Sequence, residues 1–184
     1  MKVPVWVEFS PMAIGLLLTL LLPCEGLDVG AVGHADVYFS PHGGAEAAIV
    51  LALHGAQQSL LVQGYSFTSA PIAQAVRDAH QRGVHVLVVL DRSNATGKYS
   101  AATFLAHAGI ETRIDRKHPI AHNKVMVIDN ATLITGSFNY TKAAECCNAE
   151  NTLVLTAAPD LVRAYAANVQ AHAAHSPVYV PPAQ

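Results

Sequence analysis

The chain has 184 residues, of which 52% are hydrophobic and 13% are charged. These values suit one globular domain that can bury a sizeable core. The formal net charge is only −2, which excludes a global positive field, so a polyanionic partner would have to bind a local basic patch.

Residues 1–35 have the pattern of a secretory signal peptide. Lys2 precedes an apolar run, Met12–Leu22, which Pro23 ends, and small residues follow. The run is too short for a membrane span, which needs about 20 residues. We therefore expect a periplasmic or secreted mature protein that keeps no stable membrane anchor after cleavage. An uncleaved anchor is the alternative.

Strand and helix patterns alternate along residues 36–176, which form the expected domain. Apolar, β-suited runs predict strands, and apolar side chains three or four residues apart predict helices. The continuous apolar run Val84–Leu90 is typical of a strand covered on both faces. The expected strands are residues 36–39, 59–64, 84–90, 111–114, 124–128, 132–135 and 151–155. The expected helices are residues 45–56, 71–82, 100–108, 141–147 and 158–174.

The order of these elements predicts the fold class. Helices interleaved with strands indicate an α/β fold, in which a mixed β-sheet is sandwiched between helices. The proline-rich residues 177–184 predict a loose C-terminal tail.

The segment Ala121–Thr141 concentrates polar side chains that suit phosphodiester chemistry. Alternation along a strand places His122 and Lys124 on the same face. The imidazole can act as base, acid or nucleophile near neutral pH, and the ammonium suits a phosphate oxygen. Ser137 and Asn139 add a hydroxyl and an amide. Together these groups could stabilise the charge that develops when a phosphodiester is cleaved.

A carboxylate and several cations accompany this segment. A nucleophilic histidine needs a partner that holds its tautomer, and Glu150, at the start of the next strand, is available. Three residues shortly before His122 are candidates for lining the approach of the substrate: Arg116, Lys117 and His118. Between residues 92 and 142, seven side chains are basic and three are acidic. This patch suits a nucleic-acid backbone, although an ordinary solvated surface gives the same count.

The cysteine and histidine spacing predicts no metal site. Cys146 and Cys147 are adjacent, there is no CxxC motif, and no group of side chains has the ligand spacing of a zinc site. Adjacent cysteines rarely bridge each other, so we expect a small buried thiol or a disulfide across a dimer.

The polar residues of the segment Ala121–Thr141 resemble the motif of a known family. His122-x-Lys124-x4-Asp129, followed by Gly136-Ser137-x-Asn139, is similar to the HKD motif of the phospholipase D superfamily. The stretches VYFSP, GYSFTS, AVRDAHQRGVHV, TGSFNYTKAAE and NAEN extend the resemblance over roughly residues 36–172. They resemble successive landmarks of the small bacterial endonucleases that carry a single HKD motif.

The resemblance implies a mechanism that needs no metal or other cofactor. His122 would attack phosphorus and form a covalent phosphohistidine, and a second histidine would protonate the leaving oxygen. Lys124 and Asn139 would bind the phosphate. Ser137 would support the site, and Glu150 would orient the nucleophile.

Two further expectations follow from the motif. Asp129 is its third residue, but it lies in a turn after the strand, so we expect it to hold the hairpin rather than to transfer a proton. The chain carries one HKD motif, whereas the active centre of the family uses two. A homodimer with a shared active site is therefore expected.

Three functions remain in competition. The leading one is a secreted or periplasmic phosphodiesterase, most simply a sequence-nonspecific endonuclease acting on DNA or RNA. The second is a phospholipase D-type lipid phosphodiesterase that acts on phosphatidyl or cardiolipin substrates. No exposed amphipathic stretch stands out in favour of this alternative. The third is a nucleic-acid-binding module without turnover, against which the intact motif argues.

Overall fold

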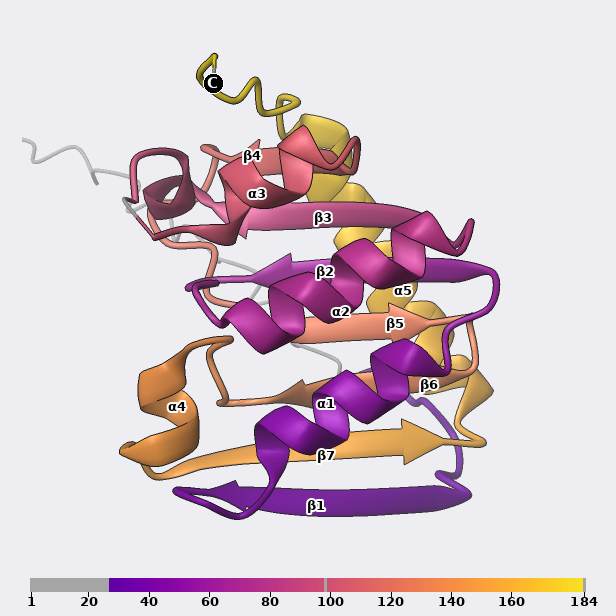
Figure 1. Cartoon of the computed structure of the whole chain (residues 1–184). Coiled ribbons are helices and arrows are strands. Elements are labelled where there is room, and N and C mark those ends of the chain that lie inside the picture. Colours follow the sequence, from indigo (N-terminus) through magenta and orange to yellow (C-terminus); the bar gives the residue numbers. More distant parts are fainter. Residues whose placement is uncertain (1–26, 98, 184) are drawn as a thin grey trace, which may run out of the picture.

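The computed structural model describes residues 27–183, except residue 98. Within these residues the strands form one seven-stranded sheet in the order β1-β7-β6-β5-β2-β3-β4 (Figure 1). The strands are β1 (His34–Ser40), β2 (Ser59–Gly64), β3 (His85–Asp91), β4 (Glu111–Asp115), β5 (Val125–Ile128), β6 (Thr132–Gly136) and β7 (Glu150–Thr156). The helices are α1 (Ala45–His54), α2 (Ala70–Gln81), α3 (Ala101–His107), α4 (Lys142–Cys146) and α5 (Pro159–His175), with a 3-10 helix η1 (Arg92–Ala95).

The sheet is mixed, as the sequence predicts. Strands β2, β3 and β4 are parallel to one another, and the pairs β2–β5, β5–β6, β6–β7 and β7–β1 are antiparallel. The parallel strands need long crossover connections, which α2 and α3 supply. Helices α1, α2 and α3 cover one face of the sheet and α5 crosses the other (Figure 1). This confirms the expected α/β fold with the sheet between helices.

Each face of the sheet has its own apolar core. On the α1–α3 side, Val88 and Leu90 of β3 belong to one cluster of buried side chains. On the α5 side, Val89 packs in a second cluster with Val162 and Val169 of the helix. The side chains of a strand alternate between faces, so the continuous apolar run of β3 serves both cores.

Side-chain caps set the starts of α2 and α3. The Ser69 hydroxyl accepts the N–H of Ile72, and the Ser100 hydroxyl accepts the N–H of Ala102. Pro71 occupies the first turn of α2, where its missing N–H costs no helical hydrogen bond. These caps explain why both helices begin within a residue of the predicted positions.

The two ends of the domain differ from expectation. Strand β1 begins at His34, which pairs with Thr156 of β7, so the sheet includes residues 34 and 35, two residues before the predicted start of the strand. The predicted signal peptide otherwise falls largely on residues 1–26, outside the described residues. The C-terminal stretch is not a loose tail, because the N–H of Tyr179 donates to the carbonyl of Thr112 at 2.7 Å. It lies along the open edge of β4. No helix among the described residues is long and apolar enough to span a bilayer.

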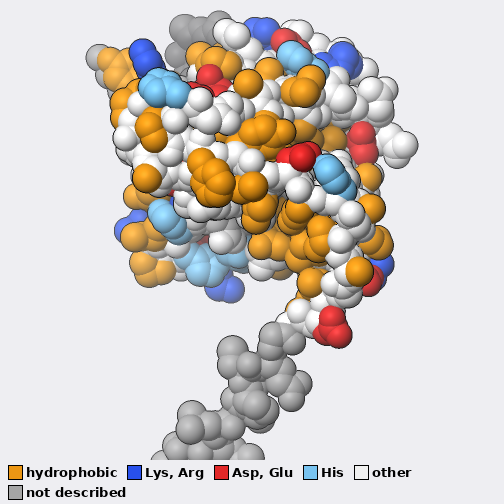
Figure 2. Space-filling view, turned by 90° about the horizontal axis from the view of Figure 1, so that it is seen from below, with side chains coloured by type: hydrophobic (Ala, Val, Ile, Leu, Met, Phe, Trp, Pro, Cys, Tyr) orange, Lys and Arg blue, Asp and Glu red, His pale blue; other side chains and the backbone are white. Residues whose placement is uncertain are grey.

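The opposite edge of the sheet is open. Figure 2 views the molecule from below Figure 1, on the side of β1, and shows hydrophobic side chains gathered on this face. Val37 and Phe39 of β1 are 51% and 63% exposed. Within the described part of the chain, β1 has a strand partner on one side only, so its outer edge is a surface at which another chain could pair.

Candidate active site

One edge of the sheet collects the polar residues singled out in the sequence. Strands β2, β3, β4 and β6 end at this edge, and β5 and β7 begin there because they run in the opposite direction (Figure 1). Lys124 directly precedes β5 and His122 lies two residues earlier. Ser137 follows β6, and Glu150 opens β7. The sheet topology therefore brings Glu150 to the hairpin segment.

Tyr65, the residue after β2, is the common neighbour of His122 and Lys124. Its ring centroid lies 4.6 Å from the centroid of the His122 ring and 5.2 Å from Nζ of Lys124. The Lys124 ammonium also donates to the main-chain carbonyl of His122 at 2.6 Å. The imidazole and the ammonium are thus held beside one aromatic ring, although both residues precede the first residue of β5.

The two groups differ sharply in exposure. His122 is exposed, whereas only 6% of the Lys124 surface is accessible. Burial lowers the pKa of the Lys124 ammonium below its usual value, and the negative charge of Glu150 partly opposes this shift. A cation held in a poorly solvated position interacts more strongly with a phosphate than one surrounded by water. The arrangement therefore suits an exposed nucleophile above a fixed positive charge.

Ser137 links β6 to the start of β7. Its hydroxyl donates to Oε2 of Glu150 at 2.6 Å and accepts the N–H of Asn151 at 3.1 Å. The side-chain amide of Asn148 donates to the other carboxylate oxygen of Glu150 at 3.1 Å. No hydrogen bond among the described residues joins Glu150 to His122, so the orienting role of Glu150 stays a prediction.

Gly136 allows the close approach of these two strands. It has a φ of 150°, and a Cβ atom at this position would collide with the main-chain carbonyl oxygen of Asn151.

Asn139, three residues after Gly136, has a buried side-chain oxygen for which the described residues provide no hydrogen-bond partner. Its proposed contact with phosphate is not tested by this geometry.

Asp129 lies at the other end of β5, away from the polar edge. Its carboxylate accepts three main-chain N–H groups, from Gln57 at 2.9 Å, Gln58 at 2.7 Å and Ser59 at 2.8 Å. Burial acts to raise the pKa of Asp129, but these hydrogen bonds outweigh it and leave the pKa below its ordinary value. The third residue of the motif therefore has the contacts of a structural anchor, which is the role expected for it from the sequence.

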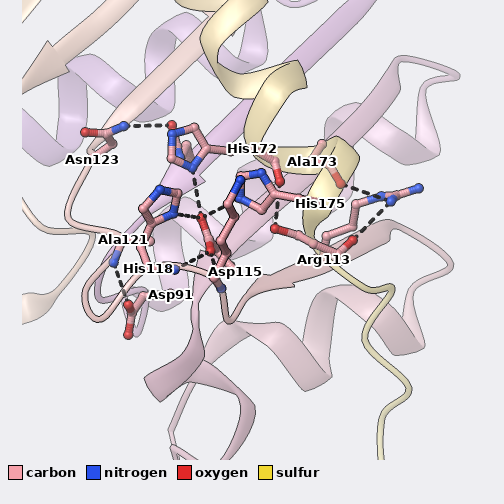
Figure 3. A network of polar contacts seen from close by, with 12 residues as sticks. Asp91, Arg113, Asp115, His118, Ala121, Asn123, His172, Ala173 and His175 are labelled. Carbon is pink, nitrogen blue, oxygen red and sulfur yellow. Dashed lines mark hydrogen bonds and ion pairs between the residues drawn. The ribbon is translucent and has the colours of Figure 1, made fainter.

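Sequence reasoning missed two residues that position the site, Tyr65 and Asp91. Asp91 is 3% exposed, and its Oδ2 atom accepts the N–H of Ala121, directly before His122, at 2.8 Å (Figure 3). Burial acts to raise the pKa of Asp91, but hydrogen bonds from Ser93 and Ala121 bring it below its ordinary value. Both residues stand at the carboxyl end of a buried parallel strand, and ligand sites of α/β sheets gather at such strand ends. Their position after an apolar run in the sequence could therefore have identified them as candidates.

The loop after β4 contains the three residues proposed to line the substrate approach. Arg116 and Lys117 are exposed. The ring of His118 turns toward Asp115, with Nδ1 placed 2.9 Å from Oδ2 (Figure 3). Whether these side chains touch a substrate stays a prediction.

The expectation that no side chains assemble with metal-ligand spacing is wrong. Asp115 and His118 from the β4 end meet His172 and His175 of α5, and their ligand atoms all lie within 4.8 Å of one another. Burial acts to raise the pKa of Asp115, but hydrogen bonds from the three imidazoles, led by His172, hold it well below the ordinary range. The overlooked signal is two pairs, each spaced by three residues, on segments that are distant in the sequence.

The cysteines also differ from expectation. Cys146 and Cys147, at the end of α4, are joined to each other by a disulfide bond. Neither sulfur is then a free thiol, and neither is available for a disulfide across a dimer.

Comparisons with known proteins agree with the fold and with the motif. Residues 49–173 match the family described as cardiolipin synthase, PLD-like domain. The chain belongs to the phospholipase D superfamily. It is 38% identical to Nuc of Salmonella typhimurium, a phospholipase D family member of known crystal structure, with a TM-score of 0.77. That match covers 79% of this chain and 97% of Nuc, and it confirms the family resemblance and the fold class.

Two curated relatives match a smaller share of their own length. The chain is 42% identical over 117 residues to a phospholipase D of Rickettsia felis, covering 64% of this chain and 58% of that protein. It is 37% identical over 135 residues to the human mitochondrial cardiolipin hydrolase, covering 73% of this chain and 54% of the hydrolase. The chain thus spans little more than half the length of these phospholipase D superfamily relatives.

Proposed function

We propose that this chain is a phosphodiesterase that cleaves DNA or RNA as a sequence-nonspecific endonuclease. The observation that carries the proposal is the placement of exposed His122 and buried Lys124 beside the ring of Tyr65. A nucleophile and a desolvated positive charge can then act on one phosphate group.

The proposed reaction proceeds in two displacements at phosphorus. An unprotonated nitrogen of His122 attacks the phosphorus, and the bond to the leaving oxygen breaks as the phosphohistidine forms. The leaving oxygen takes a proton from the His122 of a second copy of the chain. Water then attacks the phosphohistidine, loses a proton to that second imidazole and releases the phosphate monoester. Lys124 compensates the charge of the phosphoryl oxygens in both steps, and the mechanism requires no metal.

The loop before the nucleophile favours a nucleic acid as the substrate. Arg116 and Lys117 are exposed there, and surface cations of this kind bind a phosphate backbone by releasing its counterions. One observation favours the lipid alternative: Ile120, two residues before His122, is 59% exposed and could contact an acyl chain. The names of the curated relatives agree with that alternative.

The proposal includes a homodimer and export from the cytoplasm. One chain supplies one HKD histidine, and the reaction uses a nucleophile and an acid. Because His122 is exposed, a twofold axis beside it could bring two copies of the site together. The periplasmic or secreted location rests on the signal-peptide pattern of the N-terminal residues.

A parallel substrate assay tests the proposal. The purified protein and its His122→Ala variant are incubated in excess EDTA with plasmid DNA, single-stranded RNA and cardiolipin vesicles. We expect the unaltered protein to cleave DNA or RNA in EDTA and the variant to lose at least a thousandfold in rate, because no other group replaces the nucleophile. Cleavage of cardiolipin alone would establish the lipid alternative. Equal rates for a folded His122→Ala variant would refute the mechanism.

A further inference from the structure

The cluster around Asp115 joins the end of β4 to the last turns of α5. Asp115 ends β4, and its side chain is fully buried. His118 lies in the loop toward β5, while His172 and His175 are three residues apart on α5 and therefore share one face of that helix. Figure 3 shows the three imidazole rings converging on the carboxylate.

The ligand atoms lie close to the separations of a four-coordinate metal site. Oδ2 of Asp115 lies 2.8 Å from Nδ1 of His172, 2.9 Å from Nδ1 of His118 and 3.3 Å from Nε2 of His175. Zinc–nitrogen bonds of about 2.0–2.1 Å in a tetrahedron place neighbouring ligand atoms about 3.3 Å apart. With all four ligand atoms within 4.8 Å of one another, small side-chain movements complete the tetrahedron.

Main-chain hydrogen bonds hold the Asp115 carboxylate so that Oδ2 faces the three imidazoles. Its other oxygen, Oδ1, accepts the N–H groups of Lys117 at 3.0 Å and His118 at 3.2 Å. The carboxylate therefore faces five donors, two main-chain N–H groups and three imidazoles, although it has about four lone-pair positions. The three imidazoles all converge on Oδ2. A cation between Oδ2 and the ring nitrogens would resolve this excess, because each imidazole would then offer a lone pair instead of a proton.

We propose that Asp115, His118, His172 and His175 bind one divalent transition-metal ion, with Zn²⁺ as the preferred ion. Imidazole nitrogens with one carboxylate oxygen form a ligand set that zinc accepts, and they suit it better than Mg²⁺ or Ca²⁺, which prefer oxygen ligands. Four protein ligands leave no open coordination position for substrate or water. The ion would therefore be structural, and the proposal is independent of the substrate.

The position of the site defines its task. Arg113 already ties the end of α5 to β4, because its guanidinium donates to the carbonyls of Ala173 and Ser176, both at 3.1 Å (Figure 3). The metal would add a second tie, from the same helix end to the loop that continues into His122. It would thus fix the start of the segment that carries the nucleophile, without touching the phosphate.

Metal binding is tested on tag-free protein that has been dialysed against a chelator. After addition of Zn²⁺ and gel filtration, elemental analysis should find one ion per chain. A hundredfold excess of free Zn²⁺ over its Kd should raise Tm by about 5–10 °C. The double variant His172→Gln/His175→Gln should lose both effects, while the matched control His54→Gln/His85→Gln, which alters exposed histidines outside the cluster, should keep them.

A spectroscopic measurement covers the case in which the cluster variant does not fold. Co²⁺ bound to the unaltered protein should give the intense visible bands of tetrahedral coordination. The proposal is overturned if the unaltered protein retains no Zn²⁺, if Co²⁺ shows only the weak bands of octahedral coordination, or if the cluster variant binds as well as the control. Metal content, Tm and the Co²⁺ spectrum are all measured without substrate, so failure of phosphodiester cleavage would not be confused with failure of the metal site.

Discussion

Replacing Asp129 by alanine should destabilise the fold while leaving the chemistry intact. The carboxylate accepts three main-chain N–H groups that join the turn after β5 to the start of β2. A hydrogen bond to a charged acceptor stabilises a protein by about 1.5–3 kcal/mol, and exposure to solvent reduces this value. The N–H groups of Gln57 and Gln58 can bond to water after the substitution, so we expect a total loss of about 2–3 kcal/mol.

Asparagine at position 129 separates the contribution of the hydrogen bonds from that of the negative charge. One side-chain oxygen can still accept from Gln58 and Ser59, which share Oδ1 in the structure, so Asp129→Asn should cost only about 1 kcal/mol. The folded pKa of Asp129 is below its unfolded value of about 3.9. The charge therefore contributes stability above that pH, and the contribution is lost as the pH falls through the folded pKa. The wild type and the asparagine variant should converge in stability upon acidification.

Urea unfolding followed by circular dichroism measures these differences, and in thermal unfolding the alanine variant should lose about 4–12 °C in Tm. Asp160→Ala is the matched control, because Asp160 forms an exposed ion pair with Arg163, and its loss should cost at most about 1 kcal/mol. Hydrolysis of bis(p-nitrophenyl) phosphate by the folded variants reports on the chemistry. A stable Asp129→Asn protein without turnover would refute the structural assignment and place this carboxylate in the reaction.

Three other substitutions test the site. Gly136→Ala should lower stability by about 1–3 kcal/mol in urea unfolding, since the added methyl meets the Asn151 carbonyl; an unchanged midpoint would show that β6 and β7 separate easily. Asp91→Asn should lower kcat for bis(p-nitrophenyl) phosphate by about tenfold with little change in KM, because the Ala121 N–H loses a charged acceptor and the nucleophile loosens; a pure KM effect would argue against positioning. Excess His122→Ala chains mixed with unaltered chains should suppress activity beyond dilution, and strict proportionality to unaltered chains would exclude a shared centre.

The secondary structure followed closely from local patterns, whereas contacts between distant segments did not. Strand β2 was predicted at residues 59–64 as observed, because an apolar run there is bounded by turn and helix-cap residues. The HKD motif placed His122 and Lys124 near each other because they are two residues apart. Tyr65 and Asp91 reach the same site only through strand order, which the periodicity of single segments does not specify.

The Asp115 cluster shows the same limit more clearly. His172 is 57 residues from Asp115, and the two meet because α5 crosses the sheet and ends beside β4. The C-terminal stretch was predicted to be loose from its proline content. It is held instead by main-chain hydrogen bonds to the free edge of β4, a type of contact that leaves no hydrophobic pattern in the sequence.

The segment that carries His122, the proposed nucleophile, is fixed at several main-chain positions in the absence of substrate. Asp115 holds the N–H groups of residues 117 and 118, Asp91 holds that of Ala121, and Lys124 holds the carbonyl of His122. Ordering one flexible residue costs about 1–2 kcal/mol of conformational entropy. For this loop that cost is met during folding, so in the proposed reaction the binding energy of the substrate can be directed to aligning a phosphate with the imidazole of His122.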